Sequence, residues 1–173
     1  MRCLALASEP IDSIDAENRR LATDVLSRAR ELGVTLGCAE SCTGGMIAAA
    51  LTAISGSSES FVGGVVSYWV DVKESMLDVD AHIIDEHGVV STQTAEAMAC
   101  GARRALGCDY AIATTGIAGP TGAEPGKPVG TVCYGVASPD GVSSFTCCAG
   151  ETRDEVRARA VSMALEALLE ALS

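Results

Sequence analysis

The sequence is poor in aromatic residues and contains no long apolar run. Hydrophobic residues make up 48% of the 173 positions, but only two Phe, one Trp and three Tyr are among them. The core must therefore be built from Ala, Val, Leu and Ile. No apolar run approaches the roughly 20 residues that a membrane-spanning helix needs, and the apolar stretch at the N-terminus is too short for a signal peptide. We expect a soluble, cytoplasmic protein without a membrane partner.

Positive charge is scarce as well. The net charge of −11 argues against nucleic acid or an anionic membrane surface as a partner. Of the 12 basic residues only two are lysines, Lys73 and Lys127. Arginine keeps its proton in proteins, whereas a desolvated lysine can lose it and act as a base. The two lysines are therefore candidates for chemistry.

The eight cysteines do not predict a disulfide framework or a zinc site. Most of them lie inside apolar runs, and their spacings match no zinc-binding pattern. Cys147 and Cys148 are neighbours in a strand-like run and point to opposite faces, so they are not expected to pair. We interpret the cysteines as reduced and mostly buried thiols.

Hydrophobic periodicity predicts one α/β domain over residues 15–173, preceded by an N-terminal extension over residues 1–14. The predicted helices cover residues 15–32, 43–54, 71–77, 80–86, 92–106 and 152–172, and the predicted strands cover residues 34–39, 61–70, 109–115, 129–137 and 143–149. Strands alternate with helices early in the chain, and a hairpin follows late. This order predicts a three-layer α/β/α sandwich with a mixed, mostly parallel sheet.

The segment Ala39-Glu40-Ser41-Cys42-Thr43-Gly44-Gly45 lies at a predicted strand-to-helix corner. Ser41 is a candidate nucleophile, and the two glycines allow the backbone to come close to a ligand. The free N–H groups at the start of a helix can hold a phosphate or stabilise an oxyanion. A serine at this position is also a common helix N-cap. The residues alone leave these alternatives open.

A serine nucleophile needs a base, which is usually a histidine. His82 and His87 lie five residues apart in a polar stretch and are interpreted as surface residues, so a Ser-His-Asp triad is not expected. Lys73 follows the second predicted strand and would share an edge of the sheet with Ser41 if the two strands are parallel. Burial would lower the pKa of Lys73 far enough for it to act as the base, and Tyr68 could share a hydrogen bond between them. An ordinary solvated lysine is the alternative interpretation.

The loop over residues 116–128 is rich in glycine and proline and follows a predicted buried strand. Such a loop suits an anion or another polar ligand, and it contains Lys127. It lacks the Gly-Lys-Ser/Thr order of a P-loop, so it does not predict nucleoside triphosphate binding. A long structural turn is the alternative interpretation.

Taken together, four motifs resemble the CinA C-terminal domain family over about residues 20–170. They are Ala39–Gly45, Gly56-Ser57-Ser58, Tyr68 with Lys73 five residues later, and the run from Thr115-Gly116-Ile117-Ala118-Gly119-Pro120 to Lys127-Pro128-Val129-Gly130-Thr131-Val132. Stand-alone members are nicotinamide-nucleotide amidohydrolases of the PncC type. The chain lacks the separate N-terminal domain of full-length CinA proteins and looks like the deamidase module alone.

The resemblance implies hydrolysis of the carboxamide of nicotinamide mononucleotide to nicotinate mononucleotide and ammonia, a step in pyridine nucleotide salvage. It implies no metal or organic cofactor, a three-layer α/β/α fold, and a homo-oligomer as the expected assembly. The implied catalytic residues are Ser41 as nucleophile, with Tyr68 and Lys73. We further expect an oxyanion and substrate-binding set made of Thr43, Gly44, Gly45, Thr115, Gly116 and Lys127.

One departure from the family pattern concerns the residues between Tyr68 and Lys73. The family usually has Ser-Asn after the tyrosine, and this chain has Trp69-Val70. The change would either retune the substrate fit or weaken the activity, so a module that binds and senses a pyridine nucleotide is an alternative. A thiol amidase that uses Cys42 is a third hypothesis.

Overall fold

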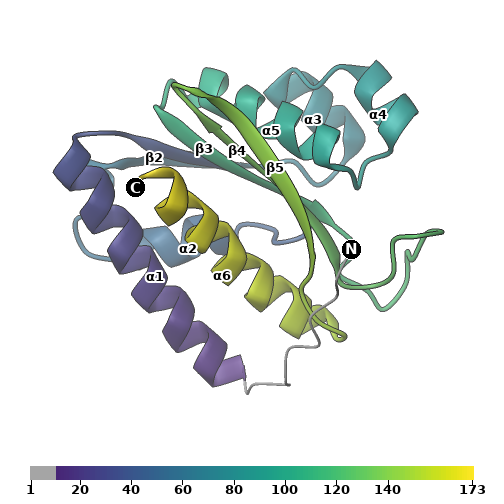
Figure 1. Ribbon diagram of the computed structural model, residues 1–173, viewed down its shortest axis with the longest axis horizontal. Coiled ribbons are helices and arrows are strands. Elements are labelled where there is room, and N and C mark those ends of the chain that lie inside the picture. The colour runs from purple at the N-terminus through teal and green to yellow at the C-terminus, as the bar shows by residue number, and fades with distance from the viewer. Residues whose placement is uncertain (1–10) are drawn as a thin grey trace.

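The computed structural model describes residues 11–173 as a five-stranded mixed sheet between two layers of helices (Figure 1). The strand order is β2-β1-β3-β4-β5. The strands are β1 (Leu36–Glu40), β2 (Phe61–Val66), β3 (Tyr110–Gly116), β4 (Thr131–Ser138) and β5 (Gly141–Cys148). The helices are α1 (Ile11–Leu32), α2 (Met46–Thr52), α3 (Val70–Leu77), α4 (Ala81–His87), α5 (Thr92–Leu106) and α6 (Arg153–Ala171), with a short 3-10 turn, η1 (Ser57–Glu59).

The predicted three-layer architecture is confirmed. Helices α1, α2 and α6 cover one face of the sheet, and α3, α4 and α5 lie on the other (Figure 1). The core beneath α5 is made largely of alanines, among them Ala39, Ala111 and Ala113 of the central strands. The sheet is mixed, but its pairings divide evenly: β2–β1 and β1–β3 are parallel, and β3–β4 and β4–β5 are antiparallel. The sheet was expected to be mostly parallel, and this part of the prediction is wrong.

Two predicted boundaries differ from the structure. Helix α1 is already formed at Ile11, the first described residue, whereas the sequence predicted a start at residue 15; Ile14 continues the buried stripe of Leu21 and Val25. The remainder of the predicted extension, residues 1–10, lies outside the described residues. Strand β2 ends at Val66 instead of continuing to residue 70. Lys73 therefore lies on helix α3 and not at the end of a strand.

The three parallel strands bring the candidate site together. Glu40, the last residue of β1, is in register with Val66 of β2 and Thr114 of β3, so all three strands end at one edge of the sheet. Strand β1 lies between β2 and β3. The chain passes from β1 to β2 on one side and then crosses through α3, α4 and α5 to β3 on the other side. Ligands in α/β sheets bind at the carboxyl ends of strands at such a switch point. Ser41 follows β1 at this position.

The seven cysteines among residues 11–173 form no disulfide, and Cys38, Cys42, Cys108 and Cys133 are buried. This agrees with the interpretation of the cysteines as reduced thiols. None of the helices described over residues 11–173 combines the length and the apolar content that crossing a membrane requires.

Helix α3, which carries Lys73, can approach α5 closely because residue 101 is a glycine. A Cβ atom at Gly101 would lie 1.9 Å from the backbone oxygen of Leu77. The clash involves backbone rather than the end of a flexible side chain, so one of the two helices would have to move. Gly101 therefore fixes the distance between α5 and the C-terminal end of α3.

We predict that Gly101→Ala lowers the free energy of unfolding by about 1–3 kcal/mol, because it overpacks this contact. At an exposed helix position the same substitution would stabilise the protein by up to about 1 kcal/mol. Chemical denaturation shows whether the substitution lowers or raises the free energy of unfolding. Gln93→Ala, at an exposed position of α5, is the control and should change stability by less than about 0.5 kcal/mol. A stabilised Gly101→Ala variant would contradict the close approach.

Candidate active site

Ser41 and Lys73 are in direct contact at the carboxyl edge of the sheet. Lys73 Nζ lies 3.0 Å from Ser41 Oγ and 2.5 Å from the carbonyl oxygen of Ser67. The backbone N–H of Ser41 donates to the carbonyl of Thr114 on β3, at 3.0 Å, which fixes the serine on the sheet. Both side chains are buried, and Lys73 has no exposed surface. The sequence-predicted nucleophile and base are therefore within hydrogen-bond distance of each other.

Burial changes the chemistry of Lys73. Desolvation lowers the pKa of its ammonium group from 10.5 to about 8. Among residues 11–173 no carboxylate forms an ion pair with Lys73 that would raise the pKa again. The neutral amine is thus the minor form near pH 7 but is far more populated than for an ordinary lysine, and only this neutral form can accept a proton. The alternative interpretation, an ordinary solvated lysine, is wrong.

Cys42 is adjacent to the nucleophile but is not an activated thiol. Burial raises the pKa of Cys42 to about 12, so the thiol stays protonated at neutral pH. Reactive cysteines instead have a lowered pKa and partial exposure. The structure therefore gives the thiol amidase hypothesis no support.

Glu40 has a role that the sequence analysis missed. Its buried carboxylate accepts N–H groups from Gly45 at 2.9 Å, Ile47 at 3.1 Å and Ala48 at 2.8 Å. These are amides at the start of α2, which lack partners inside the helix. Glu40 thus ties the first turn of α2 to the end of β1. The sequence did contain a signal for this role, because Glu40 is an acidic residue directly before the candidate nucleophile and shortly before a helix start.

The Gly44 and Gly45 amides, predicted as oxyanion donors, already have acceptors. The Gly44 N–H donates to the carbonyl of Ser41 at 3.1 Å, and the Gly45 N–H donates to Glu40. Both glycines have left-handed backbone angles, with φ of 60° and 97°. The Thr43 hydroxyl pairs with the Thr114 hydroxyl at 2.9 Å. In this structure the turn holds Ser41 in place, and its glycine amides are engaged within the turn.

Arg157 of α6 braces the same turn from outside. Its guanidinium donates to the carbonyl of Cys42 at 3.2 Å and to the carbonyl of Thr43 at 3.1 Å. The turn after β1 is therefore fixed by three elements: β3 through Thr114, α2 through Glu40, and α6 through Arg157. A nucleophile held in this way loses little conformational freedom when it reacts.

Tyr68 does not lie between Ser41 and Lys73. Its side chain is 54% exposed, and its hydroxyl accepts a hydrogen bond from Arg153 Nη2 at 3.2 Å. The predicted sharing of a hydrogen bond among serine, tyrosine and lysine is thus replaced by the direct contact of Lys73 with Ser41. Tyr68 lines the same cavity as Ser41.

This cavity has a volume of about 310 Å³, at the lower end of the roughly 300–1,000 Å³ of small-molecule sites. Its lining includes the predicted residues Ser41, Tyr68, Thr115 and Gly116. Thr115 Oγ1 donates to the carbonyl of Val89 at 2.8 Å, so its hydroxyl proton is engaged. The predicted ligand Lys127 does not line the cavity.

The charged residues that do line the cavity are Glu124 and Arg153. Lys127 lies 3.5 Å from Glu124 and pairs with it. Arg153, the first residue of α6, donates to the carbonyl of Gly119 at 3.0 Å as well as to Tyr68. Sequence reasoning did not single out Arg153, because more than 80 residues separate it from Tyr68.

Trp69 and Val70, the departure from the family pattern, lie outside the cavity lining. Trp69 is the N-cap residue of α3, where its side chain forms no capping hydrogen bond, and it is 73% exposed. Serine is a preferred N-cap and tryptophan is not. Trp69 thus gives α3 no side-chain cap, and the contact between Lys73 and Ser41 is formed with this residue present.

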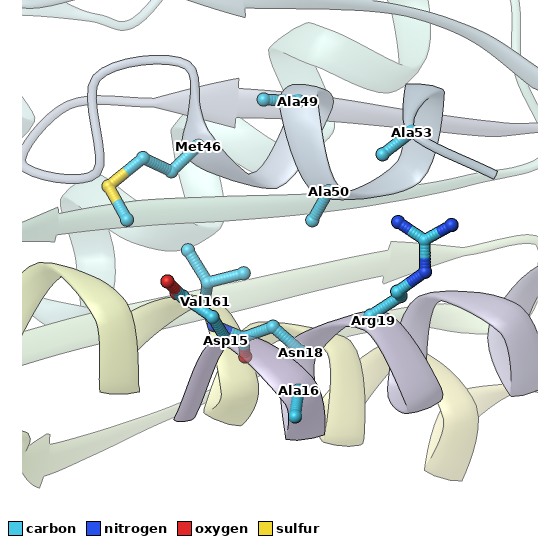
Figure 2. Close-up of a pocket in the computed structure, with 9 residues that line it drawn as sticks. All are labelled: Asp15, Ala16, Asn18, Arg19, Met46, Ala49, Ala50, Ala53 and Val161. Carbon is cyan, nitrogen blue, oxygen red and sulfur yellow. The ribbon is translucent and has the colours of Figure 1, made fainter. Parts of the chain in front are cut away.

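A second cavity, of about 470 Å³, lies between α1 and α2 (Figure 2). Its lining is mostly alanine and aliphatic surface, including Met46, Ala49 and Val161, with Asp15 and Arg19 on the α1 side (Figure 2). It contains none of the predicted site residues. Its size alone does not make it a catalytic site, because it lacks a nucleophile with a base.

Comparisons with known proteins agree on one family. The family model of the CinA C-terminal domain matches residues 18–172. A CinA-like protein of Synechococcus sp. (strain RCC307) is 46% identical over 155 residues, covering 88% of this chain and 37% of the relative. A CinA-like protein of Mycolicibacterium gilvum (strain PYR-GCK) is 51% identical over 142 residues, covering 82% and 34%. The chain thus spans only about a third of the length of these curated relatives.

Solved structures match over nearly their full length. A competence/damage inducible protein, CihA, from Agrobacterium tumefaciens has a TM-score of 0.87 and 39% identity, covering 96% of this chain and 99% of that one. A CinA superfamily protein from Enterobacter cloacae has a TM-score of 0.87 and 29% identity, covering 100% and 99%. These matches confirm the fold.

We predict that Glu40→Ala lowers the free energy of unfolding by about 3 kcal/mol, because it leaves three amides at the start of α2 without an acceptor. Glu40→Gln keeps one carbonyl oxygen and should lose less. Glu59→Ala removes a largely exposed carboxylate 3.8 Å from Arg30 and should cost less than about 0.5 kcal/mol. Equal stabilities of Glu40→Ala and Glu59→Ala in urea denaturation would refute the role of Glu40.

The pKa of Lys73 predicts a pH dependence of stability. Between pH 8 and pH 10.5 the folded chain has released the Lys73 proton while the unfolded chain keeps it. The unfolded state therefore binds more protons, and the Lys73 contribution to the free energy of unfolding rises with pH, by about 2 kcal/mol from about pH 8 to about pH 10. Denaturation of the wild type and of Lys73→Met at both pH values measures the difference. A difference independent of pH would mean that Lys73 keeps a normal pKa.

Proposed function

The chain belongs to the CinA C-terminal domain family, as its motifs predicted, and we propose that it hydrolyses the carboxamide of nicotinamide mononucleotide to nicotinate mononucleotide and ammonia. The observation that carries the proposal is the 3.0 Å contact between Ser41 Oγ and the buried amine of Lys73. A hydroxyl beside a neutral amine is an activated nucleophile for acyl transfer. The identity of the substrate is inferred from the resemblance to the family.

In the first step Ser41 attacks the carboxamide carbon and Lys73 takes the serine proton. A bond forms between Ser41 Oγ and the carbon, and an electron pair moves onto the carbonyl oxygen. When the tetrahedral intermediate collapses, the bond to the amide nitrogen breaks. The proton held by Lys73 leaves with the amine as ammonia. The product of this step is an ester between Ser41 and the nicotinoyl group.

In the second step a water molecule hydrolyses the ester. Lys73, neutral again, takes a proton from the water as it attacks the ester carbon. The bond to Ser41 Oγ then breaks, and the serine regains its proton from Lys73. General base catalysis of this kind contributes about 10²–10⁴-fold to a rate. One lysine with a pKa of about 8 serves both steps, because it exchanges protons readily near neutral pH.

Tyr68 is proposed to donate to the reacting carboxamide. Arg153 donates to the phenol oxygen of Tyr68, and a guanidinium cannot accept a hydrogen bond in return. The phenol hydrogen is therefore available to another acceptor, and Tyr68 lines the same cavity as Ser41. Its O–H can stabilise negative charge on the carbonyl oxygen, a task for which the Gly44 and Gly45 amides are not free.

The proposal concerns the module that this chain contains. The matched segments make up only 37% and 34% of these curated relatives, so activities that depend on the other parts of the relatives do not follow from the proposal. A soluble cytoplasmic location and a homo-oligomeric assembly remain proposals that accompany the proposed reaction.

We predict that the wild-type protein releases ammonia from nicotinamide mononucleotide and that kcat/KM rises with pH to a plateau above about pH 8, since only neutral Lys73 accepts the proton. Lys73→Met should lower kcat by about 10²–10⁴-fold, and Ser41→Ala should abolish turnover. Cys42→Ala is the matched neighbour control and should keep its activity. A coupled ammonia assay across the pH range measures all four proteins.

The outcomes separate the competing hypotheses. Undiminished turnover in Lys73→Met would rule out the serine–lysine mechanism. Loss of activity in Cys42→Ala with activity retained in Ser41→Ala would establish a thiol amidase. Tight binding of the nucleotide by the wild type without any ammonia would favour the sensing module.

A further inference from the structure

Arg153 lines the cavity and has more N–H donors than its two hydrogen bonds among the described residues use. A guanidinium has five N–H donors, and two contacts of Arg153 occur among the described residues, to the carbonyl of Gly119 and to the hydroxyl of Tyr68. Neither partner carries a negative charge. No carboxylate within residues 11–173 lies in ion-pair distance of Arg153. The positive charge is thus positioned by neutral groups and not neutralised.

Other arginines in the described part of the chain have different surroundings. Arg20, Arg28 and Arg104 lie away from the cavity and form ion pairs with Glu or Asp. The guanidinium of Arg157 donates hydrogen bonds to two backbone carbonyls in the turn that follows Ser41. Arg153 combines a position in the lining of the Ser41 cavity with the absence of a carboxylate partner over residues 11–173.

The acidic side chain that lines the cavity does not oppose an anionic ligand. Lys127 lies outside the lining but 3.5 Å from Glu124, and the backbones of these two residues also pair with each other. Lys127 therefore offsets the charge of Glu124. The positive charge of Arg153 remains as the charge that a ligand in this cavity would meet.

We infer that Arg153 is the receptor for the phosphate group of the substrate and that it makes the site select a phosphomonoester over the corresponding nucleoside. This inference rests on the proposed function for the identity of the ligand. Arginine suits the task, because its planar donor pairs match two oxygens of a phosphate. The carboxamide end of the ligand lies at Ser41, and its phosphate end lies at the Arg153 side of the same cavity. Lys127, which the sequence placed in the substrate-binding set, instead pairs with Glu124.

The inference also explains the placement of Tyr68. Arg153 donates to the phenol oxygen of Tyr68 and has further N–H donors that a phosphate could use, so phosphate binding and the position of the tyrosine depend on one side chain. Arg153 then acts on the substrate directly and on Tyr68 indirectly. These two effects are separable, because a ligand without phosphate meets only the second.

The test is equilibrium binding to the full chain by calorimetry, with nicotinamide mononucleotide and nicotinamide riboside as probes. Ser41→Ala serves as the background, so that no substrate is consumed. We expect the nucleotide to bind at least about tenfold more tightly than the riboside, since charge-assisted hydrogen bonds are strong. Arg153→Gln should weaken nucleotide binding by about 10–100-fold and riboside binding by much less, because the riboside loses only the indirect effect through Tyr68. Arg153→Lys should recover part of the loss, because it restores the charge without the planar donors.

Two further variants complete the design. Arg104→Gln removes an exposed arginine on α5 that pairs with Asp78 and should leave both affinities unchanged. Lys127→Gln tests the expectation from the sequence. Loss of the phosphate preference in Lys127→Gln but not in Arg153→Gln would overturn the inference. So would equal losses for nucleotide and riboside in Arg153→Gln, or the absence of nucleotide binding in the background protein.

Failure of this inference is distinguishable from failure of the proposed function. If the nucleotide binds through its phosphate to Arg153 but the wild type releases no ammonia, the phosphate subsite is supported and the proposed reaction is refuted. Ammonia release that is unaffected by Arg153→Gln would support the reaction and remove the subsite. Inorganic phosphate should compete with the nucleotide in the background protein and lose this effect in Arg153→Gln.

Discussion

The burial of one amine beside one hydroxyl is the constraint on which the site depends. Lys73 has no exposed surface and lies 3.0 Å from Ser41. Because desolvation penalises the charged form, burial turns a side chain that is normally a cation into one that can accept a proton near neutral pH. The contact holds only if α3 approaches the sheet closely. The glycine at position 101 lets the C-terminal end of α3, the helix that carries Lys73, lie against α5.

The serine side of the contact is held by a different set of forces. The carboxylate of Glu40 collects three amides at the start of α2, and Arg157 holds two carbonyls of the turn. The Gly45 amide donates to Glu40 and the Gly44 amide donates to the carbonyl of Ser41, so both glycine amides have acceptors within the turn. The proposed mechanism therefore assigns the stabilisation of the oxyanion to Tyr68. Ser41 and Arg153 both line the cavity, and the proposals place the reaction at Ser41 and the phosphate at Arg153.

Much of the site was readable from the sequence because its residue types are rare or locally patterned. Ser41 stands at a strand-to-helix corner, and Lys73 is one of two lysines. Both were predicted to meet at one edge of the sheet, and they do. The partners of Tyr68 and Lys127 were harder to predict, since they depend on the direction in which these side chains point at the surface. Arg153 was missed because its contacts with Gly119 and Tyr68 span 34 and 85 residues of sequence.

The sequence by itself determined the alternation of strands and helices, the family and the serine–lysine pair, because periodicity, turn residues and motif order are local properties of the chain. Only the tertiary structure decided that the strand pairings divide evenly between parallel and antiparallel, that Lys73 is fully buried on a helix, and that Arg153 rather than Lys127 lines the cavity. Burial, pKa and charge pairing depend on which distant segments pack together, and no local pattern encodes that.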